Sequence, residues 1–411
     1  MDISAHLGYR GIDFITMFNY VWAVELNRYG LEFVGLWPKT DEVANNDLRA
    51  IVTFILVTFF CFIPLLCSLV RVWNDMIFII DNLQATLPVT VVLVKLIIMW
   101  WKRKGASLIM RMIAEDWIEV KVDADRDVMI RRAQSARLIV ICGYVSMLFT
   151  YIMIIILPAF GLHFRYITNF TDGNKELPLQ TYYFYDTSKS PQFELTYAVQ
   201  ALSMFLGVIT YTSVDAFFGL AIFHICGQME NFKRRMLTLI SNKNFDCALR
   251  NNVKIHLRLH LHTYFYRFAN NVEDTFAFMM LGLVFYFAIV FCLYGFVLVS
   301  IISGNDTNNI SVSRKCFAVL VVVILLSYTL LYCAAGEIVT EQCEALYRTL
   351  CDLEWYKLES RKQSVIILLM LRANKPFRIT AGKLFPLTVS TFCSLLKTSA
   401  GYISFLLAMS E

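Results

Sequence analysis

Charged residues are scarce in this sequence. Only 17% of its 411 residues are Asp, Glu, Lys or Arg, and 58% are hydrophobic. Soluble domains carry about 25% charged and 45–50% apolar residues. Proline and glycine number only 8 and 17, and no linker rich in them divides the chain. A water-soluble globule is therefore a poor interpretation, and the apolar runs along the whole chain predict one membrane domain.

Motifs for enzyme chemistry are missing as well. The chain has neither the phosphate-binding pattern GxxxxGK[ST] nor GxGxxG. His256, His260 and His262 have a spacing found in metal sites, but they lie in a basic segment, 254–267, without an acidic or cysteine partner at ligand spacing. We expect a solvated or headgroup-facing helix there. The sequence predicts no enzyme, no cofactor, no metal and no nucleic-acid partner.

A disulfide framework and a cleaved signal peptide are also not indicated. The eleven cysteines fall inside apolar runs or beside basic segments, which is typical of small buried apolar residues. Residues 1–47 mix acidic, basic and aromatic residues, with no apolar core followed by a small-residue cleavage site.

Seven stretches are long and apolar enough to span a membrane, which takes about 20 residues. Two of them are weaker. The second carries Asp81, Asn82 and Gln84, and the last includes Arg378, Lys383, Pro386 and Lys397. The predicted spans are 48–70, 76–101, 136–160, 195–226, 274–303, 315–340 and 378–409.

Basic residues alternate between the segments that join these spans. Eight lie in 102–135, eight in 227–273 and six in 341–377, against one in the first connection, three in 161–194 and one in 304–314. Cytosolic segments retain Lys and Arg. The N-terminus is therefore predicted to lie in the cytosol and, after seven spans, the C-terminus outside, opposite to a G-protein-coupled receptor.

Three N-glycosylation sequons agree with this orientation. Asn169, Asn305 and Asn309 each stand two residues before Ser or Thr, and all lie in the segments poor in basic residues. Such sequons are used only on the luminal side. We expect these three asparagines to face outside, as glycosylation sites of a glycoprotein.

Charged residues within the spans are candidates for function because they are costly in a membrane. They are too few for a relay of several acids in register, and no repeated halves with matching Gly or Pro breaks are present, which argues against a transporter. The candidates are Asp81, Lys95, Asp215, Glu337, Lys383 and Lys397.

The end of the chain has a specific order of residues. It runs Tyr332-Cys333, Gly336, Leu346-Tyr347, Trp355, Arg372-Ala373, Pro376, Ala381-Gly382, Phe392, Lys397-x-Ser399 and Tyr402, and Leu36-Trp37-Pro38 precedes the first span. In this order, and in its inverted topology and segment lengths, the chain resembles the insect odorant receptors.

The resemblance implies an all-α, seven-transmembrane bundle that forms a ligand-gated, non-selective cation channel in the plasma membrane of a sensory neuron dendrite. The pore is lined by the last helix of four subunits, in which an odorant-specific chain joins a shared co-receptor. The implied partners are co-receptor subunits, a small volatile ligand, permeant cations and membrane lipid. The expected organisation is a cytosolic segment 1–47, a six-helix membrane domain 48–340 with an outer-half ligand pocket, and an anchor segment with the pore helix, 341–411.

Two departures separate this chain from its relatives. The co-receptor has a long insertion where 227–273 is short, which favours the tuning subunit. Gustatory receptors, the alternative channel family, begin this ending with Thr-Tyr and close it with Gln-Phe, whereas here it begins Gly401-Tyr402 and lacks the Gln. A G-protein-coupled receptor is a less favoured alternative.

The family pattern places the gate one or two turns beyond Tyr402. Phe405, Ala408 and Met409 stand there at i, i+3 and i+4, on one helix face. An apolar ring of these side chains can gate a pore by dewetting. Lys397 is expected to point toward an interface or water.

The resemblance also implies an odorant pocket in the outer half, among the second, third, fourth and sixth spans. Such pockets are largely hydrophobic, with a few polar groups. Core packing or lipid contact is as good an account of any one residue there. The candidates are Phe78, Asn82, Leu83, Thr86, Met147, Thr150, Tyr151, Ile154, Tyr197, Ala201, Met204, Phe205, Phe317, Leu320 and Ile324.

Overall fold

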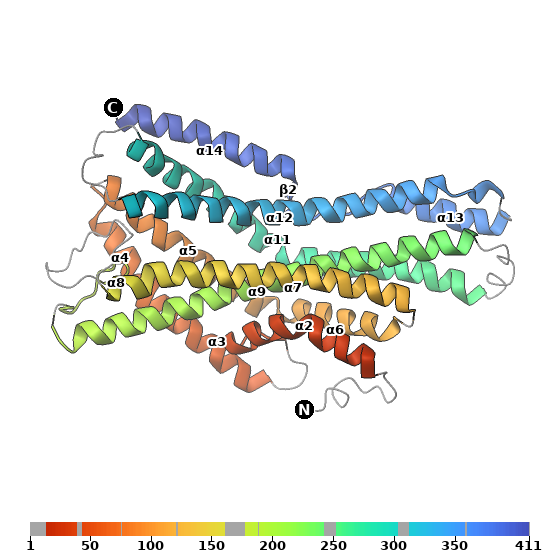
Figure 1. Cartoon of the computed structure of the whole chain (residues 1–411), viewed down its shortest axis with the longest axis horizontal. Coiled ribbons are helices and arrows are strands. Elements are labelled where there is room, and N and C mark those ends of the chain that lie inside the picture. The colour runs from red at the N-terminus through yellow and green to blue at the C-terminus, as the bar shows by residue number, and fades with distance from the viewer. Residues whose placement is uncertain are drawn as a thin grey trace.

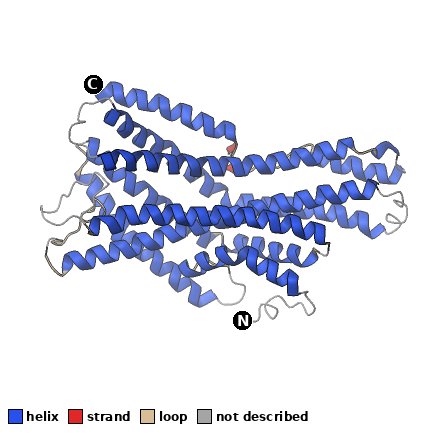
Figure 2. Cartoon of the chain, in the orientation of Figure 1, coloured by secondary structure: helices blue, strands red, loops and turns tan. Residues whose placement is uncertain are grey.

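The structure is a computed structural model of the chain, and helices make up most of it (Figures 1 and 2). It describes residues 14–38, 43–74, 76–120, 122–160, 177–187, 189–241, 252–302, 312–357 and 360–410. The α-helices are α2 (Phe14–Val34), α3 (Val43–Val57), α4 (Ile63–Arg71), α5 (Met76–Trp101), α6 (Arg103–Glu119), α7 (Asp123–Tyr151), α8 (Leu157–Ala159), α9 (Gln192–Ser241), α11 (Asn252–Ile302), α12 (Val312–Asp352), α13 (Ser360–Ala373) and α14 (Val389–Ser410).

The long helices run side by side along one axis and form an elongated bundle (Figure 1). The described ends of α9, α11 and α12 that border the basic segments gather with α13 at one end of the bundle, which we call the basic end. The C-terminal end of α14 lies at the opposite end. The described ends of the helices that border basic segments thus lie away from the C-terminal end of α14.

Six of the helices are long and apolar enough to cross a membrane within the described residues. They cover Leu48–Arg71, Phe78–Trp101, Asp123–Ala159, Gln192–Leu237, Phe265–Val299 and Ala318–Asp352. The first six predicted spans are thus found, and α14 lies beside α11 as a seventh long helix. Several extend well past the predicted ends because α9, α11 and α12 continue unbroken toward the basic end.

The start of the last predicted span is wrong. The sequence predicted 378–409, but α14 begins at Val389, and two short antiparallel strands, β1 (Thr380–Ala381) and β2 (Phe385–Pro386), precede it. The backbone takes positive φ at Gly382 and Lys383, which ends any helix there. Arg378 and Lys383 therefore do not enter a span, which removes two of the charges that made it look weak.

This hairpin ties α14 to α11 and α12. Lys383 Nζ lies 2.7 Å from Asp274 Oδ1, and the Thr380 backbone N–H donates to Glu273. Glu337 Oε2 accepts from the Val389 N–H, 3.2 Å away, at the first residue of α14. An acidic group at a helix N-terminus accepts a hydrogen bond from a free backbone N–H and interacts favourably with the helix dipole. The start of α14 is therefore bound to both α11 and α12.

Proline interrupts two of the spans at the end opposite the basic one. A π-helical segment, Thr58–Phe62, comes directly before Pro64, and another, Ile152–Ile156, comes before Pro158. Proline has no N–H for the helical ladder, so a carbonyl one turn earlier loses its donor. Tyr183 donates to the Phe60 carbonyl at 2.8 Å, and Tyr197 donates to the Ile155 carbonyl. Side-chain hydroxyls thus satisfy the altered backbone.

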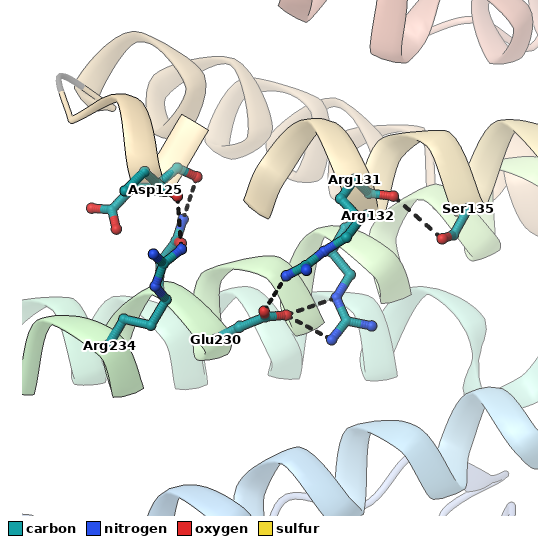
Figure 3. Close-up of polar contacts among 8 residues, drawn as sticks. Asp125, Arg131, Arg132, Ser135, Glu230 and Arg234 are labelled. Atoms are coloured by element: carbon teal, nitrogen blue, oxygen red, sulfur yellow. Dashed lines mark hydrogen bonds and ion pairs between the residues drawn. The ribbon is translucent and has the colours of Figure 1, made fainter. Parts of the chain in front are cut away.

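Ion pairs join α7 to α9 near the basic end (Figure 3). The Glu230 carboxylate lies between Arg131 and Arg132, with Arg132 Nη2 at 2.7 Å. One turn away, Arg235 Nε lies 2.6 Å from Asp125 Oδ2, and Arg234 donates to the Ala124 carbonyl. We call this group the α7–α9 clasp. It fixes the register of two helices that pack along much of their length.

Candidate ligand cavity

A cavity of about 190 Å³ lies among α5, α7, α9, α11 and α12, on the side of the bundle away from the basic end. Its wall is mostly apolar, as expected of a site for a small organic molecule. The lining residues are Val57, Gln84, Ala85, Pro88, Val89, Val92, Met147, Thr150, Tyr151, Ile154, Ile155, Leu179, Ser203, Met204, Gly207, Val208, Tyr211, Tyr286, Tyr294, Val321, Ile324, Leu325 and Tyr328.

Hydroxyl groups in the wall are largely engaged with the backbone. Thr150 Oγ1 donates to the Ser146 carbonyl at 2.9 Å, Ser203 Oγ to Val199 O at 2.7 Å, and Tyr151 Oη to Ala201 O at 3.0 Å. Tyr328 Oη lies 3.2 Å from Ser146 Oγ. These bonds lower the polarity that a ligand meets, so the cavity suits an apolar molecule with few polar atoms.

The loop 177–187 covers part of the cavity at the end opposite the basic one. Leu179 of the segment 177–187 reaches the cavity wall. The segment is fixed by Gln200 of α9, whose Nε2 donates to Thr181 Oγ1 and Tyr183 Oη, each at 2.8 Å. Gln200 and Leu179 are almost fully buried. The loop thus forms part of the cavity wall on this side.

Six of the fifteen residues predicted for the pocket line the cavity. They come from α7, the π-helical segment Ile152–Ile156, α9 and α12, and they are Met147, Thr150, Tyr151, Ile154, Met204 and Ile324. Eight others lie outside its wall: Phe78, Asn82, Leu83, Thr86, Tyr197, Ala201, Phe205 and Leu320. The side chain of Phe317 lies outside the described residues.

The polar residues outside the wall hold neighbouring elements together. Asn82 Nδ2 donates to the Leu65 and Gln180 carbonyls at 3.2 and 3.3 Å, and its Oδ1 lies 2.8 Å from Thr86 Oγ1. Asn82 is fully buried by these contacts. Phe205 packs edge-to-face against Tyr151, with ring centroids 5.7 Å apart. These side chains support the cavity from behind and do not face its interior.

Sequence reasoning missed the contribution of α11 and the deeper part of α9. Tyr286 and Tyr294 line the cavity from α11, and Tyr211 closes it on α9. A periodic signal was available, because Met204, Gly207, Val208 and Tyr211 repeat at i, i+3, i+4 and i+7 on one helix face. The prediction used depth from the outer end and stopped about two turns before Tyr211.

The residues predicted for the gate lie on α14. Phe405 is 61% exposed and Tyr402 59% exposed in the single chain. The side chains of Ala408 and Met409 lie outside the described residues. Lys397 is exposed and does not pack into the bundle. One face of α14 is therefore exposed with respect to the described part of this chain.

Two further predictions fall wholly or partly beyond the described residues. Asn169, Asn305 and Asn309 lie outside them, as do the side chains of His256, His260 and His262. Within the described part of the chain, no three His, Cys, Asp or Glu side chains come close enough to hold a metal ion.

Comparison with known proteins identifies the family. The sequence model described as 7tm odorant receptor matches residues 75–400. Odorant receptor 22c of Drosophila melanogaster is 25% identical over 312 residues, which cover 74% of this chain and 75% of that protein. Odorant receptor 13a of the same species is 24% identical over 268 residues, 62% of each chain.

A solved structure has the same fold. The insect olfactory receptor OR5 from Machilis hrabei, solved in complex with eugenol, superimposes with a TM-score of 0.78 over 96% of this chain and 99% of that one, at 16% identity. At that identity the likeness speaks for the fold, and the family follows from the sequence match. The chain belongs to the 7tm odorant receptor family.

Proposed function

We propose that this chain is the ligand-tuning subunit of an odorant-gated, non-selective cation channel. The observation that carries the proposal is the largely apolar cavity within the helical bundle of an odorant receptor family member. Its size and lining suit a small volatile molecule with few polar atoms. Met147 and Met204 give part of the wall a soft surface that adapts to ligands of different shape.

The proposed orientation puts the basic end in the cytosol. Segments rich in Lys and Arg stay on that side, and they gather at one end of the bundle. The cavity and the C-terminal end of α14 then lie toward the outside. In this arrangement 1–47 is cytosolic, 48–340 forms the membrane domain with the pocket, and 341–411 forms the anchor segment and the pore helix.

The pore itself is proposed to form from four subunits, with a shared co-receptor as partner. The support from this chain is the exposed face of α14, whose small and hydroxyl-bearing residues would be poorly placed in bare lipid. Phe405, Ala408 and Met409 are proposed to form the apolar gate. Asn169, Asn305 and Asn309 are proposed glycosylation sites on the outer side.

The pocket residues are proposed to set which odorants act. The ligand-contact set comprises the six predicted residues that line the cavity, joined by Tyr211, Tyr286 and Tyr294. Eight predicted residues outside the wall, and Phe317, are proposed to act on ligand choice through the shape of the pocket. Eugenol, found with the Machilis hrabei receptor, belongs in any test panel as a small aromatic molecule of suitable size.

The test is a whole-cell current measurement with G-protein signalling blocked. Cells express the chain with an odorant co-receptor, and a panel of volatile alcohols, ketones, esters and phenols, including eugenol, is applied. We expect a fast inward cation current that requires this chain and is altered by replacing Phe405 or Met409. A panel response carried only by G-protein signalling, together with a surface-exposed N-terminus, would overturn the proposal in favour of a metabotropic receptor.

A matched pair of variants on α9 tests the pocket. Met204 lines the cavity, whereas Leu202, two residues away, is 50% exposed on the outside of the bundle. We expect Met204→Ala to change the half-maximal concentrations of panel compounds by about tenfold, since one buried apolar side chain contributes on the order of 1–3 kcal/mol to ligand discrimination. Leu202→Ala should leave the rank order of the panel unchanged. Equal effects of the two variants would place the binding site elsewhere.

A further inference from the structure

A buried ion pair lies directly beneath the cavity. Lys95 of α5 is completely buried, and its Nζ lies 2.5 Å from Oδ1 of Asp215 on α9, whose side chain is 13% exposed. Both residues stand within spans, where charges are costly and default candidates for function. Apolar side chains in place of a buried ion pair are often equally stabilising. Stability alone is therefore a poor reason for this pair.

Tyr211 separates the ion pair from the cavity. The residue lines the cavity wall, and Lys95 Nζ lies 3.2 Å from the centroid of the Tyr211 ring. An ammonium group at this distance is attracted to the face of an aromatic ring. The edge of the Tyr211 ring also meets Tyr328, another cavity residue, at a centroid distance of 6.2 Å. A molecule that displaces the Tyr211 ring must therefore also disturb the ammonium group of Lys95.

Tyr332 of α12 lies on the far side of the pair. Asp215 Oδ2 and the Tyr332 hydroxyl are both buried, and the two side chains are close enough to interact directly. The Tyr332 hydroxyl is also close enough to interact with Tyr211. Tyr332 therefore lies against both the ion pair and the ring that lines the cavity.

Tyr332 connects this region to α14 through packed aromatic rings. Its ring lies 6.1 Å from that of Phe287 on α11, and Phe287 stacks on Phe291 at 6.2 Å. On the same helix, Ala288 O accepts from Ser399 Oγ of α14 at 3.5 Å, and Cys292 approaches the Ser399 carbonyl. Packed contacts therefore run without a gap from the cavity wall to the proposed pore helix.

We propose that the Lys95–Asp215 pair is the element through which occupancy of the cavity biases the pore. In the arrangement seen here the pair holds α5 against α9 and favours the closed channel. A ligand that displaces Tyr211 weakens that hold and disturbs the contact of Asp215 with Tyr332, which shifts α12 and, through Phe287, α14. The inference rests on the proposed channel function and names its regulation. A ligand acts in this way only by binding the shifted arrangement better.

The first test removes both charges together. Single substitutions leave a buried charge unpaired and are expected to reduce folding strongly, so the variant is K95M/D215L, expressed with the co-receptor. We expect its spontaneous current, normalised to surface protein, to rise about fivefold or more, within the usual range of coupling between sites. The matched control is R111M/E115L, which removes an exposed pair on α6 and should leave that current unchanged. A spontaneous current equal to that of the wild type overturns the inference.

The second test keeps the ion pair and changes Tyr211. Tyr211→Phe retains the ring face over Lys95, whereas Tyr211→Leu retains an apolar wall without the ring. The probe is the panel compound that gives the largest wild-type current. We expect Tyr211→Leu to raise its half-maximal concentration about tenfold more than Tyr211→Phe does. Equal effects of the two variants overturn the role of the ring.

The outcomes separate the inference from the function on which it rests. No current of any kind from the wild-type chain with co-receptor overturns both. If the wild type gives odorant-evoked currents that Met204→Ala alters but K95M/D215L and Tyr211→Leu do not, the proposed odorant channel is supported. Only the coupling role of the ion pair is then overturned.

Discussion

In the half of the bundle near the basic end, charged side chains join neighbouring helices, whereas the other half is held largely by hydroxyl and amide groups and surrounds the cavity. The first half contains the α7–α9 clasp and the buried contact of His224 Nε2 with Asp116 Oδ2 at 2.7 Å. The second contains both π-helical segments and the loop 177–187. The half near the basic end therefore holds its helices in a fixed register, whereas the half around the cavity is able to deform.

Burial shows the same contrast. Ile109 and Ile113 of α6 are completely enclosed near the basic end, while Met204 and Tyr328 border open space. Interiors packed at crystal-like density transmit strain and resist change. Side chains that face a cavity lack contacts on one side and move at lower cost. Ligand-driven movement should therefore begin at the cavity and leave the basic half intact.

The largest effect is expected when a buried side chain is truncated in each of the two halves and the losses of stability are compared. Ile113→Ala should lower the free energy of unfolding by about 2–5 kcal/mol, because it opens a void in a closed core. Met204→Ala should lower it by less than about half as much, because one side of Met204 already faces the cavity. Thermal unfolding of the detergent-solubilised protein measures both. Equal losses would show that the cavity half is packed as tightly as the basic half.

A smaller effect is expected at the α7–α9 clasp. Glu230→Gln keeps the shape of the side chain but removes the charge that Arg131 and Arg132 share. We expect a loss of about 1 kcal/mol in unfolding free energy, since hydrogen bonds to charged groups exceed neutral ones and this site is partly exposed.

The control for the clasp is Glu344→Gln. Glu344 pairs with Arg348 four residues away on the exposed surface of α12, and such pairs contribute little. Its unfolding midpoint should match the wild type. A clasp variant that behaves like this control would mean that the ion pairs of the basic half do not set its register.

Family, fold and membrane location could be predicted from the sequence. The family match makes the chain a multi-pass plasma-membrane sensory receptor and not an enzyme, as expected. The spans followed from hydropathy because each needs a long apolar run. The start of α14 did not, because Phe385, Pro386 and Leu387 are apolar but extended. The positive φ at Gly382 and Lys383 breaks the helix that hydropathy predicted from residue 378. The contacts to Asp274 and Glu337 then fix where α14 begins.

The cavity was only partly predictable, for a physical reason. Depth along a helix follows from sequence, but the direction of a side chain depends on helix rotation, which packing decides. Asn82 was placed at the right depth and turns to the Leu65 and Gln180 carbonyls instead. The charges of Lys95 and Asp215 were recognised as unusual, whereas their pairing across 120 residues is visible only in the structure.

The smallest expected effect tests the hydroxyl groups that hold the cavity half. Tyr183→Phe removes the donor to the Phe60 carbonyl and a partner of Gln200, while the ring stays in place. We expect the free energy of local opening to fall by about 0.5–1.5 kcal/mol. This fall should be confined to the loop 177–187 and the π-helical segment before Pro64. Hydrogen–deuterium exchange should rise in those two segments and stay unchanged in α6 and the basic half of α9.

The control for this variant is Tyr185→Phe in the same loop. Tyr185 bonds to Thr196 at 2.8 Å and does not reach the backbone that Pro64 alters, so the π-helical segment should keep its exchange rate. Faster exchange there in Tyr183→Phe alone would show that a side-chain hydroxyl holds the altered backbone over the cavity. Faster exchange across the whole bundle would mean that the two halves unfold as one unit, and the contrast between a fixed and a deformable half would then be lost.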